Sequence, residues 1–143
     1  MIYPQSIVYA LEAIGYLATL DPDEVAKTKD IANRLHIPEH FLGKVLTKLV
    51  KRKFVKSIKG PSGGFKLNSN TRSISVYRIL ASLDGLSALE DNCVMGLKEC
   101  SSEHPCVLHD LWKEFKEKAI GKTQSVTIAG LSDILMAKHV LKS

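Results

Sequence analysis

Two short amphipathic stretches around His36-Ile37-Pro38 constrain the fold more than any other part of the sequence. The first runs from Thr28, an expected cap, to about Leu35 and places apolar residues at helical spacing. The second begins at Pro38, which suits a first helical turn because its missing N–H would be unpaired there. Two short helices joined by a tight turn predict a helix-turn-helix. The apolar face of the second helix is expected to carry Phe41, Leu42, Val45, Leu46 and Leu49.

The second helix would be the recognition helix, lying in the major groove of double-stranded DNA with its N-terminal residues nearest the bases. An ordinary pair of amphipathic helices is the alternative. On the DNA-binding interpretation, one set of side chains faces base edges and another approaches phosphates. The base-facing set is Glu39, His40, Gly43 and Lys44, and the phosphate-facing set is Thr47, Lys48 and Lys51.

A strand-like hairpin follows directly, with residues 54–59 and 65–67 as its arms. A hairpin after a recognition helix is a wing, and its small tip allows the backbone to approach a DNA groove closely. The segment is not a phosphate-binding nucleotide loop, because that motif needs Gly-Lys-Ser/Thr leading into a helix. The expected DNA contacts of the wing are Lys59, Gly60, Pro61, Ser62, Gly63 and Gly64, with Lys66 adding charge.

The charge distribution supports a polyanionic partner. Residues 40–83 hold ten basic and no acidic side chains, whereas residues 84–143 hold seven basic and nine acidic ones. A basic segment next to mildly acidic ones is typical of a nucleic-acid-binding surface. The sequence contains no adjacent nucleophile and base, and no paired acids in an apolar pattern, so we expect no enzyme.

All three cysteines lie within fourteen residues, in the pattern C-x6-C-x5-C-x2-H formed by Cys93, Cys100, Cys106 and His109. Three sulfurs and one nitrogen form a soft ligand set that suits zinc or an iron–sulfur cluster. A thiol redox switch and inert packing cysteines are the alternatives. The odd number of cysteines and the absence of a visible secretory signal favour a reducing, cytoplasmic setting.

Further helices are expected near residues 6–20, 75–83, 105–120 and 127–137, with Ser6, Ser75 and Thr127 as caps. Cys106 and His109 would then share one face of the helix from Pro105, and Gly121–Ser125 would break it. That helix has more apolar positions than a small domain can bury, which predicts a homodimer. No apolar run is long enough to span a membrane.

We therefore expect a mostly α fold with a small β-hairpin, namely a winged helix-turn-helix domain plus a long dimerisation helix. The expected parts are residues 1–85 for the winged domain, 86–106 for a cysteine-rich cluster-binding loop, and 105–143 for the dimerisation and C-terminal helices.

Over nearly its whole length the chain resembles the IscR/NsrR-type bacterial winged-helix regulators. The resemblance depends on Tyr9-Ala10, the segment 37–49, the wing 59–65, and the three cysteines followed by Leu108-His109-Asp110-Leu111-Trp112. It implies a cytoplasmic homodimer that binds a palindromic operator, with the cluster loop beside each DNA-binding head. It also implies that Cys93, Cys100 and Cys106 bind a [2Fe–2S] cluster, with His109 in the histidine position of one branch.

Several positions depart from the family pattern. The first cysteine spacing is one residue longer than in the branch that uses histidine. Val8 replaces the aspartate that completes the cluster in the nitric-oxide-sensing branch, so Glu12 and His104 are alternative fourth ligands. Gly43 replaces an acidic side chain that discriminates between operator classes. Since some relatives lack cysteines, zinc or no cofactor is the alternative to a cluster.

Overall fold

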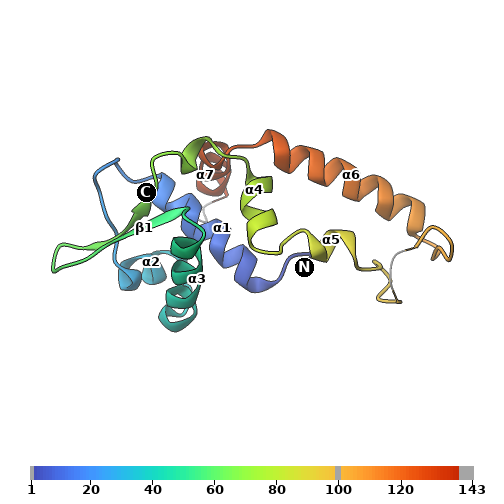
Figure 1. The fold of residues 1–143 in the computed structure, drawn as a ribbon, viewed down its shortest axis with the longest axis horizontal. Coiled ribbons are helices and arrows are strands. Elements are labelled where there is room, and N and C mark those ends of the chain that lie inside the picture. Colours follow the sequence, from blue (N-terminus) through green and yellow to red (C-terminus); the bar gives the residue numbers. More distant parts are fainter. Residues whose placement is uncertain (1, 99–100, 139–143) are drawn as a thin grey trace.

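A computed structural model describes residues 2–98 and 101–138. Most of the helices and the hairpin gather into a head, and one long helix extends away from it (Figure 1). The elements in chain order are α1 (Gln5–Ala18), α2 (Thr28–Leu35), α3 (Glu39–Lys51), β1 (Val55–Ile58), β2 (Gly64–Leu67), the 3-10 turn η1 (Thr71–Ser73), α4 (Val76–Ser82), α5 (Ser87–Glu90), α6 (His109–Ser125) and α7 (Ile128–Ala137).

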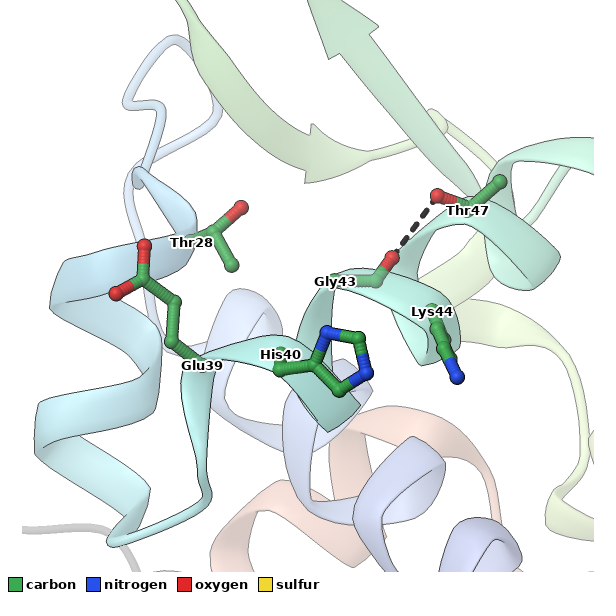
Figure 2. A pocket seen from close by; sticks show the side chains of 6 residues that line it. All are labelled: Thr28, Glu39, His40, Gly43, Lys44 and Thr47. Carbon is green, nitrogen blue, oxygen red and sulfur yellow. Dashed lines mark hydrogen bonds between the residues drawn. The ribbon is translucent and has the colours of Figure 1, made fainter.

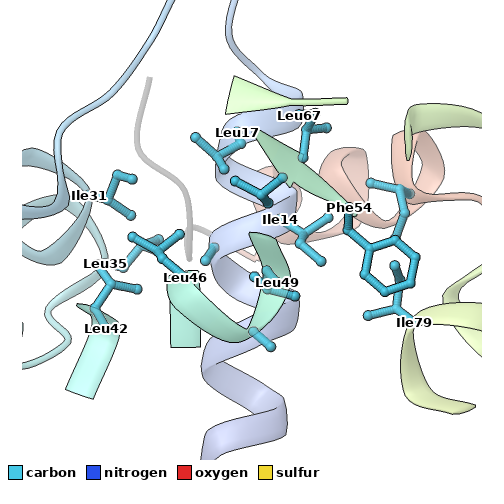
Figure 3. Close-up of a cluster of buried hydrophobic side chains, with 14 of the residues drawn as sticks. Ile14, Leu17, Ile31, Leu35, Leu42, Leu46, Leu49, Phe54, Leu67 and Ile79 are labelled. Carbon is cyan, nitrogen blue, oxygen red and sulfur yellow. The ribbon is translucent and has the colours of Figure 1, made fainter. Parts of the chain in front are cut away.

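The core of the head is built around α1, which contacts α2, α3, β2 and α7. Ile14 of α1 and Leu42, Leu46 and Leu49 of α3 are fully buried (Figure 3). Their three- and four-residue spacing is the pattern that predicted α3 as an amphipathic helix. One expected member of that face, Phe41, is instead 54% exposed. It lines a shallow hollow with Ser6 and Tyr9 of α1, so it lies at the edge of the contact between α3 and α1 and not inside it.

The turn between α2 and α3 confirms the tight break. His36 adopts a left-handed conformation with φ 55°, and the backbone N–H of Ile37 donates to the carbonyl of Ala32 at 3.0 Å. Pro38 is the N-cap of α3, one position before the first helical residue. The predicted caps Thr28 and Ser6 are wrong, because both lie inside their helices and neither side chain accepts a capping hydrogen bond.

The C-terminal end of α3 is a Schellman motif with an unusual residue. The N–H of Lys53 donates to Val50 O at 3.0 Å and that of Phe54 to Leu49 O at 3.1 Å. Lys53 adopts φ 65° at the position where glycine is common. For a residue with a side chain, this conformation costs roughly 1–2 kcal/mol.

The wing is an antiparallel pair in which Val55 faces Leu67 and Ile58 faces Gly64. Its base is tied to the loop before α2, because Ala26 and Phe65 exchange backbone hydrogen bonds of 2.9 and 2.8 Å. Gly64 permits this approach, since a Cβ there would lie 2.6 Å from the Ala26 carbonyl oxygen. The wing is therefore joined to the head at its base.

The C-terminal helix α7 packs on α1. Ser132 donates a buried hydrogen bond of 3.0 Å to the carbonyl of Gly15. The predicted caps of α4 and α7 are confirmed, because Ser75 accepts from Arg78 N–H and Thr127 from Gly130 N–H, each at 3.2 Å. These two caps also pair with each other as an isolated antiparallel bridge, so the first turns of α4 and α7 are held together.

Helix α6 corrects two expectations. It begins at His109 rather than near Pro105, so Cys106 lies in the preceding turn and does not share a helix face with His109. It continues through Gly121 to Ser125, because one glycine inside a helix costs only about 0.5–1 kcal/mol. The extended residue Val126 ends the helix, and its carbonyl accepts from Val76 N–H at 2.8 Å. The short helix α5 was not predicted.

Candidate functional site

A shallow groove of about 900 Å³ runs along the solvent side of α3 (Figure 2). The groove brings together five of the predicted base-facing and phosphate-facing residues with one further residue, Thr28. Its lining is Thr28, Glu39, His40, Gly43, Lys44 and Thr47. Lys48 and Lys51 are exposed farther along α3 and do not line it. The N-terminal half of α3 thus presents a carboxylate, an imidazole, an ammonium and a hydroxyl along one groove.

Gly43 makes the middle of this groove hollow. A Cβ built at Gly43 would meet no atom within 4 Å, so the surrounding fold does not require glycine there. Thr47 donates a hydrogen bond of 2.9 Å to the Gly43 carbonyl, which orients its side chain along the helix. A partner surface can therefore approach the α3 backbone at this point.

Thr28 is a groove residue that sequence reasoning used only as a helix cap. As the first residue of α2, it lies across the groove from α3 (Figure 2). The signal that could have identified it is its polar character at the start of the helix that precedes a recognition helix. Such helix starts often donate to phosphates.

The tip of the wing combines an exposed cation with a backbone that excludes side chains. Lys59, Pro61 and Ser62 are exposed, and Gly60 has φ 104°. The N–H of Gly63 donates to Gly60 O at 2.9 Å, and a Cβ at Gly63 would lie 2.0 Å from the Ile58 carbonyl oxygen. The turn therefore requires glycine at position 63, which explains the glycine-rich pattern of the wing.

Within the described ranges, the cations of α3 and the wing form no ion pair. Among residues 2–98 and 101–138, the one ion pair joins Lys118 to Glu114 at 2.8 Å, on α6. Lys66 donates at 3.4 Å to the carbonyl of Pro22, and the remaining lysines of this surface keep their charge free for a partner. A polyanion gains from such a surface through the release of its counterions.

The second set of predicted site residues surrounds a hollow of about 360 Å³ at the start of α6. Cys93, Cys106 and His109 all line it, as does His104, whereas Glu12 does not. Cys100 lies outside the described residues. Cys93 and Cys106 are free thiols, and His109 is 7% exposed, with its Nε2 3.4 Å from Ser102 Oγ. In the described ranges, no three histidine, cysteine or acidic groups are arranged closely enough to bind a metal.

The environment of Cys93 favours its thiolate. The backbone amide of Met95 lowers the pKa of the Cys93 thiol, partial burial opposes this, and the Leu97 amide and the Cys106 side chain lower the pKa further. A thiolate is the form that binds metal or reacts with oxidants. Two thiols and an imidazole around one hollow therefore have the right donor chemistry for a zinc ion or an iron–sulfur cluster.

Trp112 connects the cysteine loop to α6. Its indole N–H donates to the carbonyl of Asn92 at 3.1 Å, and its ring stacks on Phe115 with a centroid distance of 5.6 Å. Both ends of the loop are thus attached to the first turns of α6, its start through the hydrogen bond from Trp112 to Asn92 and its end through the chain at His109. This end of α6 lies far from the wing (Figure 1).

Residues 3–134 match the sequence profile of the Rrf2 family, described as "Iron-dependent Transcriptional regulator". The chain belongs to the Rrf2 family. It is also 36% identical over 136 residues to a protein of Aquifex aeolicus named as an HTH-type transcriptional regulator, and the match covers 94% of this chain and 93% of that protein. The chain is thus a DNA-binding transcriptional regulator and not an enzyme, as the sequence predicted.

Solved structures confirm the winged-helix Rrf2 fold. CymR of B. subtilis, titled the global cysteine regulator of that organism, superposes with a TM-score of 0.73 at 23% identity and covers 92% of this chain and 95% of its own. IscR of T. potens gives a TM-score of 0.70 at 24% identity, covering 98% and 92%. Within the described ranges, no helix of this chain has the length and apolar character needed to cross a bilayer.

Proposed function

We propose that this Rrf2 protein is a homodimeric regulator that holds a [2Fe–2S] cluster and binds a palindromic operator in the cytoplasm. The observation that carries the proposal is the shared hollow of Cys93, Cys106 and His109 at the start of α6, in a chain whose α3 and wing form a basic surface. We assign Cys100 as the third sulfur ligand from its spacing. When bound, the cluster supplies a redox-sensitive link between these side chains.

The DNA contacts we propose come from the groove and the wing. Glu39, His40 and Lys44 face base edges through the groove, and its hollow at Gly43 admits the edge of a base pair. Two further sets complete the contact, one for phosphates and one at the tip of the wing. The phosphate-facing set is Thr47, Lys48 and Lys51, and the wing set is Lys59, Gly60, Pro61, Ser62, Gly63 and Gly64.

The homodimer is supported by apolar side chains with no cover at the start of α6. Val107 is 86% exposed, Leu111 68% and Phe115 47%. Burying such side chains stabilises an interface by about 1.5–3 kcal/mol each. Two copies related by a two-fold axis would pair these faces, and each would present one α3 to the same side of the duplex.

The loop can influence the head through a continuous chain of contacts. Trp112 fixes the loop to α6, α6 packs on α4, and the bridge between Ser75 and Thr127 connects α4 to α7 and hence to α1. Ordering the loop around a cluster would restrain the start of α6. A change in the angle between α6 and the head would alter the separation of the two α3 helices, on which operator binding depends.

His109 is our choice for the fourth ligand, with His104 and Glu12 as the alternatives. The buried imidazole of His109 lines the hollow, and its backbone N–H donates to Cys106 O at 3.1 Å. His104 lines the same hollow but is exposed. Glu12 lies on α1 and belongs to the head, so it could act only on a cluster held by another chain.

The test is anaerobic reconstitution with iron and sulfide, followed by visible spectroscopy and iron and sulfide analysis. We expect a coloured protein with equal iron and sulfide, which the Cys93→Ala variant fails to form. His109→Ala should shift the spectrum and shorten the lifetime of the cluster in air, whereas the matched variant His104→Ala should not. Quenching of Trp112 fluorescence gives a second reading of cluster binding.

A colourless wild-type protein after reconstitution would contradict the cluster. Zinc without sulfide would then identify a zinc-stabilised regulator. Loss of DNA binding with peroxide in metal-free protein would identify a thiol switch, which the lowered pKa of the Cys93 thiol favours.

A further inference from the structure

A hollow of about 440 Å³ lies at the C-terminal end of α3, between that helix, the turn at residues 68–71 and the start of α4. Arg52, Lys53 and Arg78 line it together with Asn68, Asn70 and Thr71. It is separate from the groove at the N-terminal half of α3 and from the cysteine loop, and it includes none of the residues assigned to either. Its volume corresponds to roughly ten to fifteen waters, which is ample for a phosphate group.

All the charged side chains that line this hollow are positive. Three cations from two elements surround it, and no carboxylate of the described residues lines it. In the part of the chain that the structure describes, no hydrogen bond or ion pair engages the side chains of Arg52, Lys53 or Arg78. Three free cations around one hollow favour an anion with more than one negative charge.

The walls of the hollow are fixed by hydrogen bonds and need no rearrangement to accept a ligand. Asn68 donates through its amide Nδ2 to Lys53 O at 2.5 Å and through its backbone to Phe54 O at 3.1 Å. Thr71 adds a buried hydrogen bond from its hydroxyl to Phe54 O at 2.8 Å. The backbone that carries Lys53 is therefore held in place from the opposite wall.

The conformation of Lys53 is the second observation. At φ 65° this position of the Schellman motif favours glycine, yet the chain has a lysine there. The lysine side chain forms no hydrogen bond in the described structure that would repay the strained backbone. Backbone strain of this kind concentrates at functional sites, where the side chain serves a ligand.

We propose that Arg52, Lys53 and Arg78 form a binding site for a phosphate group. The site is distinct from the groove, from the wing tip and from the cluster, and it does not depend on dimerisation. The phosphate can belong to a small phosphorylated molecule or to the DNA backbone beyond the bases that α3 contacts. A phosphomonoester carries up to two negative charges and a DNA phosphodiester carries one, and both present phosphate oxygens to the two guanidinium groups and the ammonium group.

The first experiment titrates the purified full-length protein with inorganic phosphate, against sodium chloride at matched ionic strength, and follows the thermal midpoint and the heat of binding. We expect phosphate to raise Tm beyond the effect of chloride. Arg52→Gln and Arg78→Gln should each weaken the phosphate response about tenfold. The exposed Lys113 on α6 is the control, and Lys113→Ala should leave the response unchanged.

Lys53→Gly is the decisive variant, because stability and binding should change in opposite directions. Relief of the left-handed backbone should raise Tm by about 2–4 °C, while the phosphate response falls. A loss of phosphate binding in a more stable protein excludes unfolding as its cause.

The second experiment measures the salt dependence of duplex DNA binding for the same variants. If the phosphate belongs to DNA, free phosphate has no effect, and each of the three variants lowers the salt slope by about one. The proposal is overturned if the variants change neither phosphate binding nor the salt slope, or if Lys113→Ala changes them equally. Cluster content of the variants, read from their visible spectra, should match the wild type in every case.

Discussion

The winged head and the cysteine loop of this protein are built in opposite ways. In the head, Ile14, Leu42, Leu46 and Leu49 are fully buried. In the loop, Val94, Met95 and Leu97 are 44–64% exposed, and the hollow beside them is lined by thiols and imidazoles. The head therefore contains the interactions that stabilise it, whereas the loop and the start of α6 leave donor groups and apolar side chains exposed, which we propose are covered by a cluster and a second copy of the chain.

The largest expected effect is a loss of stability when the core of the head is changed. Leu46→Ala removes a fully buried side chain between α3 and α1, and should lower the free energy of unfolding by about 2–5 kcal/mol. Cys93→Ala in metal-free protein should change it by less than about 0.5 kcal/mol, because this side chain is only partly buried and lies outside the core of the head. Urea unfolding followed by circular dichroism measures both. Equal effects would contradict a loop that contributes little to the stability of the head.

The next effect concerns the surface of α6. Leu111→Lys places a charge where we propose an apolar interface, and each dimer would contain the change twice. The dissociation constant of the dimer should rise at least about 100-fold, with little change in the unfolding of the head. Sedimentation at several protein concentrations tests this. The neighbouring exposed change Lys113→Ala serves as the control, and a dimer that survives Leu111→Lys would place the interface elsewhere.

A smaller effect on DNA binding should distinguish the cations of the wing from those of the cysteine loop. Lys59→Ala in the wing should reduce the slope of log affinity against log salt by about one. Lys98→Ala in the cysteine loop should leave this slope unchanged, although it removes the same charge. Fluorescence anisotropy with an operator duplex at several salt concentrations measures both variants. The same loss of slope in both would mean that the loop, too, contacts the DNA backbone.

The smallest effect is a pH dependence within the head. Burial raises the pKa of the Glu12 carboxyl above its ordinary value. A raised folded-state pKa adds stability at pH values below the unfolded pKa, and this stability is lost as pH rises through the folded pKa. Glu12→Gln should therefore raise Tm slightly at pH 7 and leave it unchanged near pH 3. An equal shift at both pH values would show that the carboxyl titrates as in the unfolded chain.

The sequence predicted the head well because its helices follow a single rule. Apolar residues at three- and four-residue spacing placed α1, α3 and α4, and the glycines of residues 60–64 placed the wing. Phe41 was assigned to the apolar face of α3 with Leu42 and Val45, but the structure exposes it. Its exposure depends on the rotation of α3 against α1, which spacing specifies only to within about one residue.

The start and end of α6 were harder to predict. Gly121 indicated a break, but α6 continues past it to Ser125. Near its end the side-chain hydroxyls of Thr123 and Ser125 donate to the carbonyls of Ile120 and Lys122 at 2.8 Å. Pro105 indicated an early start, whereas the chain makes one further turn before His109. Local propensity does not determine which carbonyls are left to accept hydrogen bonds at a helix end.

Part of the candidate site could be predicted and part could not. Residue type and spacing identified Cys93, Cys106 and His109, which the fold brings to one hollow. Thr28 and the hollow behind Lys53 were missed, because both depend on segments that meet only in three dimensions. Spacing alone does not reveal a left-handed lysine or the far wall of a groove.

The open space at Gly43 has an evolutionary consequence. Because a Cβ there would meet no atom within 4 Å, and because we propose that this groove faces the bases, a single codon change would alter which promoters are bound at little cost to folding. Duplicated copies of such a gene could acquire separate sets of target promoters while each copy keeps the same cysteine loop.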